Sequence, residues 1–268
     1  RHAQESMVPR SVSRAPHLRA CSVALAVALL VGLATLGEAA PAPKTPAAPR
    51  SNQAKPPANT AQSALDQAKR LIDAEQPEAA AVMLRRFIEG GPAPEFLDDA
   101  YLLMAAAMYG MKEHAETIRY VNQLLGEFPN SDVVDRAKLL LAKTHARAGN
   151  LDLALPLLSE VRSLSADPAI KRDALRLTGE FQVQKKDFLR AIQAWLDELP
   201  LDVGDQAHET ENQIRELVND KLDAPALMRV RDAYPKTFPG DLASIKLIDL
   251  HTAAGEDHLV ERDVRLFL

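Results

Sequence analysis

From residue 62 to the end of the chain, apolar residues recur three and four positions apart in short blocks, which Gly, Pro or Asn separates. That spacing places the apolar side chains on one face of an α-helix, so each block predicts an amphipathic helix. Short breaks between such blocks predict helices that fold back as hairpins. Aromatic residues make up only 4% of the chain while Ala and Leu are abundant, which favours an all-α fold over a β fold.

The helical blocks of residues 62–200 repeat with a period of 37 residues, giving four units. Small residues recur at Ala68, Ala105, Ala142 and Gly179, and a second small set lies at Ala80, Thr117, Ala154 and Ala191. Four positions after the second set come the larger residues Leu84, Val121, Leu158 and Trp195. Antiparallel helices approach closely where small side chains face each other, and a larger residue one turn later fills the next hole. We therefore predict that these sets pack the helices together, with Trp195 as a core residue.

The order small, small, large, with proline near the end of the unit, resembles the tetratricopeptide repeat. The likeness is clearest at Leu141–Ala142 with Gly149–Ala154, and at Gly179 with Asp187–Ala191. The resemblance implies an α-solenoid of tetratricopeptide-like hairpins that binds protein or peptide partners in a groove. The long repeats, one of them closed by Glu127–Ser131, are similar to those of periplasmic proteins that assemble the outer membrane or coordinate the cell envelope.

The known geometry of tetratricopeptide repeats, applied to this register, predicts which residues line the groove. They are Lys69, Tyr109, Arg136, Lys143, Arg147, Arg176 and Glu180. Three of these, Arg136, Lys143 and Arg147, are spaced seven and four apart and form one cationic stripe along a helix. Such a stripe favours an acidic segment or the C-terminal carboxylate of a partner.

The first 39 residues have the pattern of a signal peptide. Six residues precede the first methionine, Met7, and are set aside; three arginines, an uncharged stretch at 20–36 and small residues at 37–40 then follow. This pattern predicts export to the periplasm, and an inner-membrane anchor if the signal stays uncleaved. Cys21, the only cysteine, would be removed with the signal, so no disulfide is expected.

Residues 40–61 and 201–268 flank the repeats. The first segment contains six prolines and few large apolar residues, which predicts a disordered linker. The second loses the period but predicts helices at 206–221, 224–233, 242–254 and 259–268, the last two forming a hairpin that the end of the chain cuts short. We therefore expect a longer protein. A signal peptide, tetratricopeptide-like hairpins and this closing hairpin are similar to the N-terminal part of activators of penicillin-binding proteins. That resemblance leaves an alternative open, a structural adaptor before a missing periplasmic-binding-protein-like domain that binds a small ligand.

The sequence contains no recognisable catalytic or cofactor-binding motif, so we expect a binding protein and not an enzyme. The chain has no phosphate-binding glycine loop and no nucleophile elbow. The nearest approach to a metal cluster is His251 and His258 with Asp249, Glu256 and Asp257, but these residues straddle a predicted turn, which favours a solvated loop. A net charge of −5 at pH 7 argues against nucleic acid as a partner.

Overall fold

The computed structural model describes residues 58–268 of the chain. Within this range the secondary structure is entirely helical, with twelve α-helices and no β-strand, which confirms the all-α prediction. The predicted signal peptide at 1–39 and the linker up to residue 57 lie outside the described residues. The first helix begins at Ala58, so the last four residues of the predicted linker are helical; Ala61 is buried, and its contact with the core explains the earlier start.

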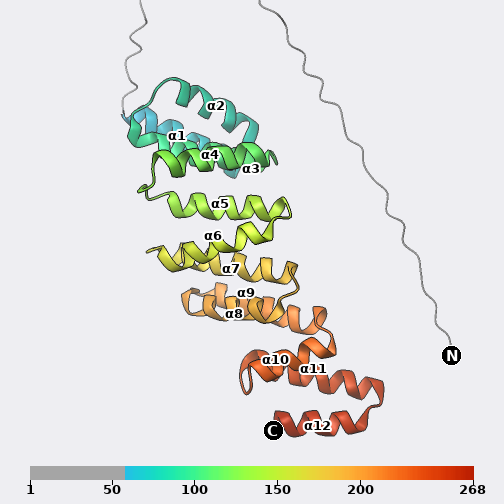
Figure 1. Cartoon of the computed structure of the whole chain (residues 1–268). Helices are drawn as coiled ribbons and strands as arrows, with labels where there is room; N and C mark the ends of the chain where they lie inside the picture. The colour runs from blue at the N-terminus through green and yellow to red at the C-terminus, as the bar shows by residue number, and fades with distance from the viewer. Residues whose placement is uncertain (1–57) are drawn as a thin grey trace, which may run out of the picture. The chain divides into compact units, whose positions relative to one another are not determined.

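Short connections join the helices (Figure 1). In chain order they are α1 (Ala58–Asp73), α2 (Pro77–Glu89), α3 (Leu97–Gly110), α4 (His114–Glu127), α5 (Val134–Arg147), α6 (Leu151–Leu164), α7 (Pro168–Gln184), α8 (Phe188–Glu198), α9 (Asp205–Glu216), α10 (Ala224–Ala233), α11 (Phe238–Ala254) and α12 (Asp257–Phe267). Three shorter helical segments are the 3-10 turns η1 (Pro94–Phe96) and η2 (Leu199–Leu201) and the π-helical turn η3 (Leu217–Lys221).

Helices α1 to α8 form four consecutive hairpins. Each helix packs on the one that follows it, and α1, α3, α5 and α7 also pack on one another in sequence. The first helices of the hairpins therefore share one side of the row. Beyond α8 the order changes, because η2 redirects the chain, η3 continues α9 and packs on α11, and α10 contacts both α8 and α11.

The three sets of residues with 37-residue spacing are buried. The first small set lies on the first helix of each hairpin, and the second small set lies with the larger residues on the second helix. In the third hairpin, Ala142 of α5 and Leu158 of α6 belong to one apolar cluster. In the fourth, the same two positions bring Gly179 of α7 against Trp195 of α8. The interior therefore repeats a small residue facing a large one.

The turn inside each of these hairpins has the same backbone conformation. Its central residue has positive φ, at Glu75 (55°), Lys112 (64°), Gly149 (80°) and Lys186 (60°), again 37 residues apart. The next N–H donates to the carbonyl five residues earlier, as Asn150 does to His145 over 2.8 Å. This is the Schellman cap, which ends one helix and aims the next. The α11–α12 hairpin repeats it at Gly255 (71°), so the last two helices form a hairpin of the same kind.

In the fourth hairpin the small facing residue is smaller, and the large facing residue is larger, than in the third hairpin. Where the third hairpin has Ala142 and Leu158, the fourth has Gly179 and Trp195. A Cβ atom on Gly179 would lie 2.2 Å from Nε1 of the Trp195 indole, far inside van der Waals contact. Glycine is therefore required here by the close approach of the ring, and the tryptophan fills the volume that the missing side chain leaves.

The start of α11 and the surroundings of one histidine also differ from the sequence prediction. Helix α11 begins at Phe238 and not at Leu242, because Pro239 lies in the first turn, where it costs no helical hydrogen bond. His251 is not in a solvated loop. It is only 8% exposed on α11, and its Nδ1 lies 2.7 Å from Oδ2 of the fully buried Asp263 on α12. Arg231 also contacts Asp263, so this carboxylate ties the last hairpin to α10.

We predict that Gly179→Ala destabilises the fold by about 1–3 kcal/mol, because the indole must move to admit the methyl group. Adding Trp195→Leu recreates the alanine and leucine pair of the third hairpin, so the double variant should lose less than the sum of the two single losses. Urea denaturation of the four proteins measures this coupling. Gly126→Ala is the matched control, since no atom outside the adjacent turns of its own helix lies within 4 Å of its new Cβ. Strictly additive losses would contradict the packing argument.

Candidate functional site

Five of the seven predicted groove residues line a single hollow of about 560 Å³. They come from three successive first helices: Tyr109 from α3, Lys143 and Arg147 from α5, and Arg176 and Glu180 from α7. Residues 71 positions apart in the sequence meet here, because α3, α5 and α7 pack along one side of the hairpin row.

The most buried residues that line this hollow, hereafter the groove, are apolar and are called its base. Leu177 and Phe181 line it from α7, only 4% and 5% exposed, and Ala146 lines it from α5. Gln184 completes the lining near the end of α7. An apolar base with polar groups above it is the usual composition of a site that binds an extended chain or a small molecule.

Tyr109 holds the guanidinium of Arg147 over the groove. The Cζ atom of Arg147 lies 3.9 Å from the centre of the Tyr109 ring, a cation–π contact, and Nη1 donates to the Tyr109 carbonyl oxygen over 3.4 Å. Burial raises the pKa of the Tyr109 phenol and the Arg147 charge opposes that rise. The contact reduces the rotamer freedom that Arg147 would lose on binding a partner.

The positive charges of the groove differ in how far they are neutralised. Arg176 pairs with Glu180 over 3.3 Å and lies 3.9 Å from Asp173. No acidic side chain among residues 58–268 forms an ion pair with Lys143 or Arg147. The α5 side of the groove therefore carries the charge available to a negatively charged partner.

The remaining two predicted residues, Lys69 and Arg136, are exposed but lie outside the lining of the groove. Arg136 lies near the start of α5, two turns before Lys143. Its charge acts on Asp99, whose pKa is raised by burial and then by the charges of Asp98 and Asp132, with Arg136 opposing the rise. The cationic stripe is therefore divided, and only its second half faces the groove.

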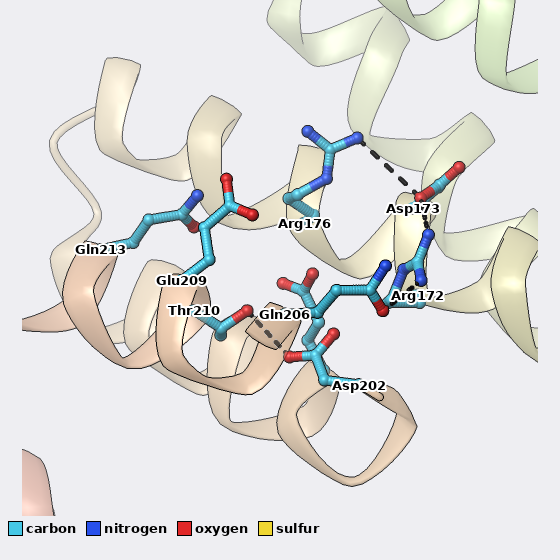
Figure 2. Close-up of a pocket in the computed structure, with 9 residues that line it drawn as sticks. Arg172, Asp173, Arg176, Asp202, Gln206, Glu209, Thr210 and Gln213 are labelled. Carbon is cyan, nitrogen blue, oxygen red and sulfur yellow. Dashed lines mark hydrogen bonds and ion pairs between the residues drawn. The ribbon is translucent and has the colours of Figure 1, made fainter. Parts of the chain in front are cut away.

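A second hollow, of about 210 Å³, shares Arg176 with the groove and is lined by α7, the end of α8, Asp202 and α9. Figure 2 shows its polar lining. The residues are Arg172, Asp173, Arg176, Glu198, Asp202, Gln206, Glu209, Thr210 and Gln213. Apart from Arg176, sequence reasoning singled out none of them.

Glu198 is the unusual residue of this second hollow, hereafter the Glu198 pocket. Glu198 is only 2% exposed, and its Oε2 atom is buried without a hydrogen-bond partner. Burial, and next the charge of Asp202, raise the pKa of Glu198 to about 8; Arg176 and Arg172 oppose the rise. This carboxyl is therefore largely protonated at neutral pH.

A signal for Glu198 is present in the repeat. The residues 37, 74 and 111 positions earlier are Val161, Leu124 and Phe87, all apolar and packed in the core. Glu198 thus places a carboxyl group where the other three hairpins have an apolar side chain. The exception is visible in the sequence when these four positions, each 37 residues apart, are compared.

Residues 58–268 contain no set of three or more His, Cys, Asp or Glu side chains placed to hold a metal ion. None of the helices in that range is both long and apolar enough to cross a membrane. Comparison of the sequence with protein-family models and with curated proteins finds no match. The groove and the Glu198 pocket are therefore the features from which a function can be inferred.

We predict that the free energy of unfolding falls as the pH rises from about 5 to above 8, and that Glu198→Gln removes this part of the fall. The folded-state pKa, about 8, exceeds the ordinary value of 4.5, so the stabilisation is complete below the ordinary pKa and is lost as the pH passes the raised one. Above pH 8 the glutamine variant should be more stable by a few kcal/mol, on the order of the pKa shift converted to free energy.

Urea denaturation of both proteins between pH 5 and pH 9 checks this expectation. Glu89→Gln is the matched control, because Glu89 is exposed at the end of α2 and does not line the Glu198 pocket. Parallel pH curves for the natural chain and Glu198→Gln would show that Glu198 does not titrate in this way.

Proposed function

We propose that this protein is a binding scaffold: an α-solenoid of tetratricopeptide-like hairpins that holds an acidic, extended peptide segment of a partner protein in the groove. The hairpin order, the buried small positions and the repeated Schellman turns support the solenoid part of the proposal. The proposal involves no turnover. Binding alone would bring the partner to the scaffold.

The observation that carries the proposal is the pair of uncompensated cations, Lys143 and Arg147, above an apolar base formed by Leu177 and Phe181. A carboxylate can receive charge-assisted hydrogen bonds from both cations while an adjacent apolar side chain packs on the base. A partner segment with an acidic residue or a free C-terminus next to an apolar residue has this chemistry. Arg147, already placed by Tyr109, is suited to a carboxylate because its planar fork can donate two parallel hydrogen bonds.

The cellular setting belongs to the same proposal. The signal-peptide pattern of residues 1–39 supports export, and the resemblance to envelope tetratricopeptide proteins supports partners in peptidoglycan synthesis or outer-membrane assembly. The alternative is a structural adaptor whose groove is unused and whose activity lies in a further domain. A peptide-binding measurement separates these two functions.

We predict that the full chain binds dye-labelled hexapeptides from a randomised pool with free C-termini, and that the bound fraction is enriched in Asp and Glu. The double variant Lys143→Glu/Arg147→Glu should lower the affinity for the selected peptides by at least about tenfold, since charge-assisted hydrogen bonds contribute about 1.5–3 kcal/mol. Fluorescence anisotropy gives the affinities, and sequencing gives the enrichment.

The matched control is Arg85→Glu/Arg86→Glu, which makes the same change in charge on the exposed face of α2. It should leave peptide affinity unchanged within about twofold once salt screens long-range attraction. Equal losses in both double variants would mean that net charge and not the groove determines binding. Absence of any peptide binding would favour the adaptor.

A further inference from the structure

Three buried oxygen atoms around the Glu198 pocket accept no hydrogen bond from any residue of the described region. They are Oε2 of Glu198, Oδ1 of Asp202 and Oε1 of Gln213. A buried acceptor left unpaired loses its hydrogen bonds to water without replacement, so such groups are rare in native proteins. Three around one cavity indicate that a hydrogen-bond donor from outside the fold belongs there.

The donors in the wall of the pocket are directed to other acceptors. Arg172 donates to Oε1 of Gln206 over 2.7 Å and to Oδ1 of Asp173 over 3.0 Å (Figure 2). Arg176 donates to Glu180 over 3.3 Å. These arginines are therefore occupied by acceptors other than the three unpaired oxygens.

Thr210 donates a hydrogen bond to only one of the two carboxylate oxygens of Asp202. Its hydroxyl donates to Oδ2 of Asp202 over 2.9 Å, which leaves Oδ1 of the same carboxylate unpaired. Glu209 adds a further acidic side chain to the lining from α9. Because both arginines are paired with acids, the charge that remains unpaired in the pocket is negative.

From this arrangement we propose that the Glu198 pocket is a second ligand site, which binds a primary ammonium group. An ammonium carries one positive charge, which can balance a negative charge on the carboxyl pair of Glu198 and Asp202. Its three N–H donors match the three unpaired oxygens in number. The cavity of about 210 Å³ suits a group of side-chain size, an alkyl ammonium or a lysine side chain.

The chemistry of the lining distinguishes this ligand from other cations. A hard divalent ion takes six or more oxygen ligands, whereas the pocket lacks even three metal-type side chains suitably placed. A guanidinium has five donors in a plane, more than the unpaired acceptors can take. Water would satisfy hydrogen bonds and leave Glu198 protonated, whereas a cation would favour its ionised form.

Proton release provides an additional readout. Near pH 7 Glu198 holds a proton, and a bound cation would favour the ionised form. The charged groups that act on Glu198 are Arg172, Arg176 and Glu180 from α7 and Asp202 after η2, and Glu209 from α9 also lines the pocket. Binding of an ammonium should therefore release close to one proton per site.

Isothermal titration calorimetry of the full chain tests the proposal. The probes are n-butylammonium and Nα-acetyl-lysine methylamide, with the Nε-acetylated lysine derivative as the uncharged control probe. We expect both ammonium probes to bind, the acetylated probe not to bind, and Glu198→Gln to weaken binding by at least about tenfold. Glutamine keeps the shape of the side chain and cannot ionise in the buried position, so this variant should fold. Titrations in two buffers without primary amines, differing in ionisation enthalpy, measure the proton released.

Glu89→Gln, on the exposed end of α2, is the control variant, and it should bind the ammonium probes as the natural chain does. The site does not depend on the proposed peptide function, since Lys143→Glu/Arg147→Glu should also leave ammonium binding unchanged. Tighter binding of the lysine derivative would assign the natural ligand to a protein side chain, and tighter binding of butylammonium to a small amine. Failure of both ammonium probes to bind, or equal binding by Glu198→Gln, would overturn the proposal and leave water as the occupant.

Discussion

Close contact between helices at positions that carry little or no side chain is the interaction on which this fold depends. In α1, α3, α5 and α7 the residue at the crossing is alanine or glycine, and a larger apolar residue of the second helix fills the space beyond it. Because the contact recurs every 37 residues with the same turn between the helices, each hairpin presents its first helix to the same side. The groove is a consequence of this repetition, since its lining comes from equivalent helices of different hairpins.

The same repetition makes departures from it informative. A core position that is apolar in three hairpins has a carboxyl group in the fourth, at Glu198. Burial of a carboxyl group without a partner opposes folding, whereas an apolar residue there would favour it. Proteins commonly retain such a local loss of stability where a ligand uses the group. The exception lies where the regular array ends and η2 redirects the chain, so a polar cavity fits between α7 and α9 without opening the core of the preceding hairpins.

The parts of the structure that follow from local spacing could be predicted from the sequence. The helical class, the packing sets and five groove residues on α3, α5 and α7 depend on register alone. Arg136 does not line the groove, because the stripe along α5 is longer than the groove and the extent of the groove depends on neighbouring helices. The environment of His251 could not be predicted either, since its partner Asp263 lies on the next helix and beyond the turn. The unpaired oxygens of the Glu198 pocket depend on where three elements meet, which no periodicity specifies.

Trp195 is the only tryptophan of the chain, and it lies in the fourth hairpin, one helical turn before Glu198 and against Gly179. Its fluorescence therefore originates from one place in a series of hairpins that mainly contact their neighbours. In such an array, local opening of one unit need not coincide with loss of helix in the others. Indole emission and far-ultraviolet circular dichroism would thus follow different parts of the same molecule, and any separation between the two transitions would measure how strongly the fourth hairpin is coupled to the rest. This optical probe is already part of the natural sequence and needs no label.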